Sequence, residues 1–179
     1  MTDQHGAAAS GVKREKELRD IVVGWGFHFI RTQVDAAKYL GISLTKGGRV
    51  RKKDVPTINA WLEDKINFDA PEEYKEAGFG RFESDGYIPE LDAIVELKGG
   101  DKAGTTEEKI MFDLEKLRDK VYGNKNIFYL FEGSKEYDKN TMLFKAKVKK
   151  DQKRGIINEN VHVIDVSTMT KEVLTELAK

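Results

Sequence analysis

Hydrophobic residues along the chain switch between helical and strand spacing, and the order of these patterns predicts the fold. Helical stripes with charged residues between them occur at residues 11–26, 34–41, 54–66, 105–123 and from 170 onward, with a short helix within 69–80. Strand-like runs occur at residues 27–32, 82–88, 93–98, 126–133 and 161–166. Because helices and strands alternate, we expect an α/β fold with a central mixed β-sheet flanked by helices.

The same patterns predict how the chain divides. Residues 1–10 are small and polar, and we expect them to form a flexible tail. The chain is 39% hydrophobic, which is enough for one core. We therefore expect a single domain over residues 11–179, in which the helical residues 34–78 form an inserted unit.

Composition narrows the possible chemistry. The chain has no cysteine and three histidines, which excludes disulfides and thiolate zinc sites and argues against a histidine zinc site, but leaves oxygen-bound metals open. Its 31 basic and 31 acidic residues balance, so attraction to a polyanion must come from local clusters. With no apolar run of about 20 residues and no signal-peptide pattern, we expect a cytoplasmic protein without membrane contact.

Charged residues lie within the strand-like stretch "SDGYIPELDAIVELKGG", residues 84–100, where unpaired charge is unfavourable. Pro89 and Asp92 favour a turn over residues 89–92, so Ile88 should lie opposite Ala93. Counting outward then places Asp85 opposite Glu96. Opposed side chains of antiparallel strands have Cβ atoms about 5 Å apart, so these two carboxylates are close enough to share one cation.

The same count places Glu83 opposite Lys98, and Phe82, Ile88, Val95 and Leu97 on a core face. Two alternatives remain open. The charges can form a solvated salt-bridge ladder on an exposed sheet face. Asp92 can replace Asp85 if a bulge shifts the register, although in the simple register it lies about 13 Å from Glu96 along one strand.

Asp85, followed by Glu96, Leu97 and Lys98, resembles the motif of the PD-(D/E)xK nuclease superfamily. "SDG" replaces the family's proline-aspartate, and residues 11–31 resemble the first helix of Holliday junction resolvase-like members, which contributes a glutamate, here Glu15. The resemblance covers residues 11–31 and 82–132. It implies a restriction-endonuclease-like core.

The resemblance also implies roles for these residues. Asp85, Glu96 and the Leu97 carbonyl would hold Mg²⁺, for which Mn²⁺ can substitute, and Glu15 would join the site. The metal would polarise a phosphate and activate water, while Lys98 would orient that water or stabilise developing charge.

Residues 34–64 are similar to a helix-turn-helix with an unusually long turn, in which the second helix carries Thr57 and Asn59. Basic residues suited to phosphate contact lie in the long turn, at Lys46, Arg49, Arg51, Lys52 and Lys53. The alternative is an ordinary helical hairpin with a solvated loop. Lys102 and Lys109 follow the motif and are further candidates for DNA contact, although helix capping explains that segment equally well. The basic stretch 145–154 either contacts DNA or flanks a hairpin.

We therefore expect a Mg²⁺-dependent endonuclease that resembles a type II restriction enzyme and acts on double-stranded DNA as a homodimer. One alternative is a nuclease specific for Holliday junctions or other DNA structures. Another is a DNA-binding protein without catalytic activity on a nuclease-like fold.

Overall fold

The structure, a computed structural model, describes residues 16–99, 106–132 and 135–179. Its centre is a four-stranded sheet in the order β3 (Gly86–Ile88), β4 (Ala93–Gly99), β5 (Asn126–Glu132) and β6 (Val161–Asp165). β3 and β4 are antiparallel, whereas β4, β5 and β6 are parallel. The expectation of an α/β protein with a mixed sheet is thereby confirmed.

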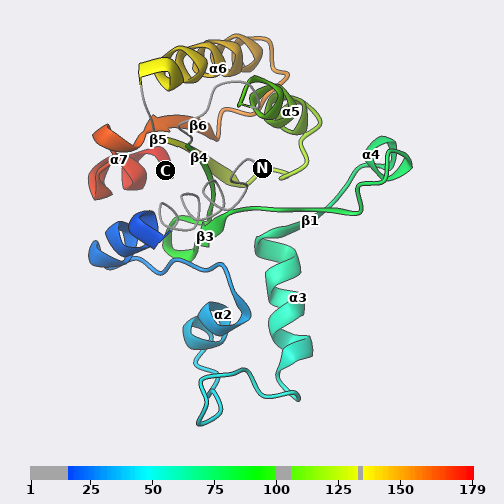
Figure 1. Cartoon of the computed structure of the whole chain (residues 1–179), viewed down its shortest axis with the longest axis vertical. Helices are drawn as coiled ribbons and strands as arrows, with labels where there is room; N and C mark the ends of the chain where they lie inside the picture. The colour runs from blue at the N-terminus through cyan, green and yellow to red at the C-terminus, as the bar shows by residue number, and fades with distance from the viewer. Residues whose placement is uncertain (1–15, 100–105, 133–134) are drawn as a thin grey trace, which may run out of the picture.

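Helices cover both faces of this sheet (Figure 1). α5 (Thr106–Arg118) and α6 (Lys135–Lys153) connect the parallel strands and pack on one face. The helix formed by residues 16–24 and α7 (Lys171–Leu177) pack on the other. Successive strand residues point to opposite faces, so each inner strand contributes to both cores.

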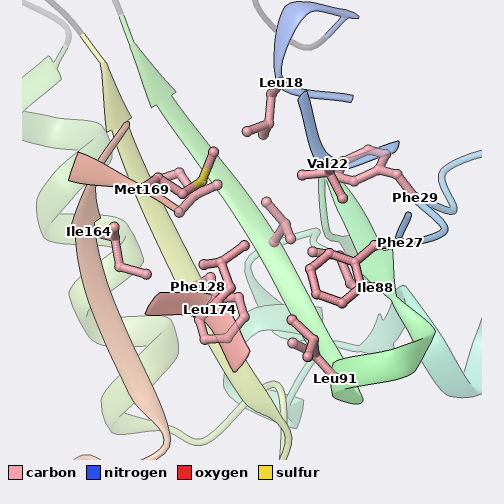
Figure 2. Packing of buried hydrophobic residues seen from close by; sticks show 13 residues of the cluster. Leu18, Val22, Phe27, Phe29, Ile88, Leu91, Phe128, Ile164, Met169 and Leu174 are labelled. Carbon is pink, nitrogen blue, oxygen red and sulfur yellow. The ribbon is translucent and has the colours of Figure 1, made fainter. Parts of the chain in front are cut away.

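The two cores differ in the side chains that fill them. Figure 2 shows the core beneath the N-terminal helix and α7, where Leu18, Val22, Ile88, Phe128 and Leu174 meet. On the opposite face, the α5 and α6 side chains cover Ile94, Ile127, Tyr129 and Phe131 of the sheet. Glu96 and Lys98 lie on this second face, because they alternate with Val95 and Leu97.

A helical unit follows the N-terminal helix and extends from the sheet (Figure 1). It contains α2 (Gln33–Tyr39) and α3 (Val55–Lys65), which share a small core around Ala36, Ile58 and Leu62. Asp35 completes a capping box with Thr32 and pairs with Arg19 of the N-terminal helix, which links the unit to the main domain. The loop 44–53 lies at the far end of this unit from the sheet (Figure 1).

The predicted strand over residues 82–88 is wrong, because the chain forms two strands there. β2 (Arg81–Glu83) pairs with β1 (Asn67–Asp69), a strand that the hydrophobic pattern did not predict, and α4 (Glu72–Glu76) lies between them. After Ser84 and Asp85 the chain joins the main sheet as β3. Glu83 consequently lies opposite Asn67, and its predicted pairing with Lys98 is also wrong.

Two further expectations need correction. Residues 27–32 form no strand, only an isolated bridge between Ile30 and Tyr87. Residues 145–153 belong to α6, because Phe144 and Val148, four residues apart, are buried while the lysines face outward, so they do not flank a hairpin. Short 3₁₀ helices form at Pro89–Leu91 and Val166–Thr168.

None of the described helices is both long and apolar enough to cross a membrane.

Candidate active site

The hairpin of β3 and β4 has the predicted register. Ile88 lies opposite Ala93 and Gly86 opposite Val95. The connection is a 3₁₀ helix followed by Asp92, whose backbone is left-handed at φ 41°. The Asp92 carboxylate accepts a hydrogen bond of 2.5 Å from the Tyr87 hydroxyl. Asp92 is therefore a turn residue, and the register shift that would have made it a ligand does not occur.

The Asp85 side chain extends the hydrogen bonding between the β3 segment and β4 by one residue pair. Its Oδ2 accepts a hydrogen bond of 2.7 Å from the backbone N–H of Leu97. The N–H and C=O of a strand residue point toward the same edge, so the Leu97 carbonyl faces the edge at which Asp85 lies. The structure thus places the Asp85 side chain on the Leu97 amide, beside the predicted partner Glu96.

Glu96 is buried beneath α5, with 3% of its surface exposed. Its Oε1 accepts a hydrogen bond of 2.7 Å from the Tyr122 hydroxyl, and its Oε2 lies 3.1 Å from the Lys98 ammonium. Burial raises the pKa of Glu96, although the nearby lysines oppose this shift. The alternative of a solvated salt-bridge ladder is wrong, since Glu96 is buried and Glu83 lies in a different sheet.

The polar contacts continue from Glu96 around a closed ring. Lys98 lies 3.1 Å from Asp113 of α5, and Asp113 lies 2.7 Å from Lys116 one helical turn later. Lys116 donates a hydrogen bond of 2.9 Å to the Tyr122 hydroxyl, which completes the ring at Glu96. We call Glu96, Lys98, Asp113, Lys116 and Tyr122 the buried ring.

Sequence reasoning missed the α5 side of this ring. Asp113 shares the helical stripe of Ile110, Leu114 and Leu117, which are all buried. An acid on an apolar stripe is a signal that it needs a buried partner, and it was available from the spacing alone. The partners themselves depend on how α5 packs on the sheet.

The ring and Asp85 together are short of positive charge. Asp85, Glu96 and Asp113 are three carboxylates against the two ammonium groups of Lys98 and Lys116, which leaves one negative charge uncompensated when all are ionised. Burial alone would lower the pKa of Lys98, but the three carboxylates outweigh burial and raise it. The lysine therefore stays charged at neutral pH.

Aromatic rings enclose the second lysine of the ring. The Lys116 ammonium lies 5.6 Å from the ring centroid of Phe82, 5.8 Å from Phe112 and 5.4 Å from Tyr122. These side chains exclude water from the α5 side of the site, which strengthens the electrostatic interactions within it.

The donor set fits a magnesium ion. Mg²⁺ is usually held by one or two carboxylates together with waters and substrate phosphates, and Asp85, Glu96 and the Leu97 carbonyl offer oxygen atoms of this kind. Within the described residues, no group of three or more acidic or histidine side chains is placed to hold a metal ion. Glu15 lies outside the described residues. Asp85 and Glu96 thus offer carboxylate oxygens of the kind that Mg²⁺ prefers, while both oxygens of Glu96 already have donors in Tyr122 and Lys98.

The predicted DNA-contacting residues lie away from this ring. Lys46, Arg49, Arg51, Lys52 and Lys53 are exposed in the loop 44–53, and none forms an ion pair with another described residue. On α3, Thr57 is exposed, whereas the Asn59 side chain accepts a hydrogen bond of 2.6 Å from Gln33. Lys102 lies outside the described residues. Lys109 lies in α5, but its side chain is outside the described part.

Comparison with known proteins identified no relative of this chain. No protein-family model matches the chain, and neither a curated protein nor a solved structure matches it.

Proposed function

We propose that this chain is a Mg²⁺-dependent endonuclease that hydrolyses phosphodiester bonds of double-stranded DNA on a restriction-endonuclease-like core. The observation that carries the proposal is the hairpin of β3 and β4. It brings the Asp85 carboxylate to the Leu97 amide, with Glu96 and Lys98 on the adjoining strand. Two carboxylates and a lysine at one strand end suit metal-assisted attack on a phosphate.

Asp85, Glu96, Leu97 and Lys98 have different roles in the proposed reaction. A metal bound by Asp85, Glu96 and the Leu97 carbonyl would supply Lewis acidity toward the phosphate and a more acidic water. Lys98 remains an ammonium ion and stabilises negative charge on the phosphate oxygens. The amide of Leu97 fixes the orientation of Asp85 before any ligand binds.

The loop 44–53 supports DNA as the substrate. Five exposed basic residues without ion-pair partners among the described residues are available for phosphate contacts. The chain carries no net charge, so this local cluster must provide the attraction. The helical unit that carries it would read the DNA sequence, which favours a sequence-specific enzyme of the type II restriction class.

Digestion of phage DNA tests this proposal. With Mg²⁺, the purified protein should produce discrete fragments, and chelation of the metal should stop the cleavage. Asp85→Asn and Lys98→Ala should each lower the rate by roughly 100-fold or more while retaining DNA binding. Asp92→Asn is the matched control, because Asp92 lies in the same hairpin but outside the site, and it should cut normally. Full activity of Asp85→Asn would overturn the metal assignment.

The N-terminal helix supports a second candidate, a nuclease specific for DNA junctions. This helix packs against the sheet. The segment after the helix pairs with β3 through Ile30 and Tyr87, so this segment lies beside the hairpin. A four-way junction and a plasmid should therefore be assayed in parallel. Cleavage of the junction alone favours this second candidate. Salt-dependent binding of intact DNA, with no cleavage of either substrate, indicates a non-catalytic binding protein.

A further inference from the structure

The two edges of the central sheet differ. The β3 edge is partly covered, since Ile30 and Tyr87 exchange two backbone hydrogen bonds of 2.9 Å. At the opposite edge, β6 has no neighbouring strand among the described residues. We infer that this edge joins two copies of the chain, whose β6 strands pair antiparallel about a two-fold axis at Val163. The inference goes beyond the proposed function, because it holds whatever reaction the chain catalyses.

The orientation of the backbone shows which N–H and C=O groups of β6 point away from β5. The Asn160 carbonyl accepts a hydrogen bond of 2.9 Å from Ile127 of β5, so residues 160, 162 and 164 face β5. The alternate residues, Val161, Val163 and Asp165, must then face outward. An independent contact agrees, because the Gln152 side chain donates a hydrogen bond of 3.0 Å to the outward carbonyl of Val161.

Groups at both ends of this outward edge already have partners within the chain. The Val161 N–H donates to the Asn158 carbonyl at 3.4 Å, and the Thr168 hydroxyl donates to the Asp165 carbonyl at 3.0 Å. No such partner among the described residues reaches the outward N–H and C=O of Val163. A residue on a two-fold axis of an antiparallel pair lies opposite itself and exchanges both bonds, which would satisfy this open pair.

The surroundings of the edge provide room and apolar surface. It borders a groove of about 500 Å³ between α6 and α7, to which Val148, Val163, Val173 and Leu177 contribute apolar side chains. Met142 continues the α6 side of this groove and is 70% exposed. Exposed apolar surface beside an open strand edge is typical of a protein contact.

Charge selects a second copy as the occupant. Gln152 contacts Val161, so the end of α6, including Lys149, lies near the start of β6, while Asp165 lies at its other end. Antiparallel pairing therefore brings Asp165 of each copy toward the partner's Lys149. The groove carries the basic residues Lys145 and Lys149 and the acidic residue Asp165, so two copies can offer each other complementary charges.

Single-cysteine crosslinking tests the contact directly, because the chain has no cysteine of its own. Val163→Cys should give a covalent dimer with a short bis-maleimide. The matched control is Val23→Cys, at a residue 50% exposed on the N-terminal helix, which should remain monomeric. Equal crosslinking of the two variants, or none at Val163→Cys, would overturn the inference.

Sedimentation over a dilution series provides the second test. The wild type should dimerise, and Val163→Pro should be monomeric yet folded, since proline at an outward edge position removes only the open N–H. Lys149→Glu should weaken the dimer roughly tenfold, whereas Lys150→Glu on another side of α6 should not. A monomeric wild type, or a Val163→Pro variant that still dimerises, contradicts the proposed contact. If the wild type is monomeric but captures a strand peptide, the edge serves a different partner.

Discussion

At the scale of single residues, the buried ring holds its charged groups in place before any ligand is bound. Each oxygen of Glu96 has its own donor, and Lys98 lies between two carboxylates at 3.1 Å from each. Buried charges of this kind are costly when a partner is removed, because the remaining charge is left uncompensated. The ring should therefore be sensitive to single-atom changes.

Tyr122→Phe removes one hydroxyl from the ring and leaves the Glu96 Oε1 without a donor. We expect the free energy of unfolding to fall by about 1–3 kcal/mol, the cost of an unsatisfied buried group. Tyr74→Phe is the control, because Tyr74 donates a similar bond of 2.6 Å to Asp119 at the protein surface. Urea denaturation measures both, and equal losses would contradict the special role of the ring.

Asp113→Asn tests whether the ring positions Lys98. The substitution removes the negative charge between two lysines, so Lys98 loses one of the two carboxylates that fix its position. We expect cleavage to fall roughly tenfold or more, with DNA affinity unchanged. Asp119→Asn, later along the chain and bonded to Tyr74, should retain activity. Normal cleavage by Asp113→Asn would show that Lys98 needs no such support.

The sequence predicted the register of the hairpin and missed the α5 side of the candidate site, for a physical reason. Asp85, Glu96, Leu97 and Lys98 are related by a short turn and by strand alternation, which can be counted. The partners from α5 and the loop after it come together only when that helix packs on the sheet. No local rule specifies that packing.

At the scale of elements, residues 82–88 do not form one strand because β2 pairs with β1 and β3 with β4, and a close contact at Gly86 lies where β3 begins. The Phe29 ring packs directly on Gly86, where an added Cβ would lie 2.3 Å from the ring. This close approach fixes the start of β3 against the segment before it. The pattern of hydrophobic residues in "RFESDGYI" does not reveal that the Phe29 ring packs on Gly86. The break between β2 and β3 was therefore not predictable from the sequence.

Gly86→Ala should consequently destabilise the protein. The aromatic ring must move, which typically costs about 1–3 kcal/mol in a packed core. Gly80→Ala is the control, since no atom lies within 4 Å of its added Cβ. Thermal unfolding of the two variants should separate them clearly, and an unchanged Gly86→Ala would mean that Phe29 moves aside freely.

Salt dependence can distinguish the two basic elements of the chain. Replacing Arg49, Arg51 and Lys53 with glutamine should reduce the slope of log affinity against log salt by about 0.9 for each phosphate that the protein no longer neutralises. The matched variant replaces Lys147, Lys150 and Lys153 of α6. If the α6 variant shows the larger change, DNA lies along that helix and not on the loop 44–53.

At the scale of the whole molecule, the candidate site lies between two basic regions. The loop 44–53 is at one end of the long axis and α6 is at the other (Figure 1). The alternation of helices and strands was enough to predict the α/β class and the mixed sheet. The ribbon of β1 and β2 was not predicted, because its three-residue strands are too short to produce a pattern.

Metal binding should stabilise the entire fold. A ligand that binds only the folded state adds about 2.7 kcal/mol at 100 times its dissociation constant. Mg²⁺ should therefore raise the melting temperature of the wild type, compared with NaCl at equal ionic strength. Asp85→Asn should lose most of this increase, whereas Asp92→Asn should keep it. Equal shifts in all three proteins would indicate that Mg²⁺ binds elsewhere.

Asp85 is also the joint between the ribbon and the central sheet. The residue before it ends the connection from β2, and the residue after it begins β3. The ribbon does not move freely about this joint, because Tyr74, Phe79 and Phe82 pack against Phe112 of α5. The Asp85 linker is therefore anchored on both sides, so the carboxylate of a proposed metal ligand is held in place before a substrate binds.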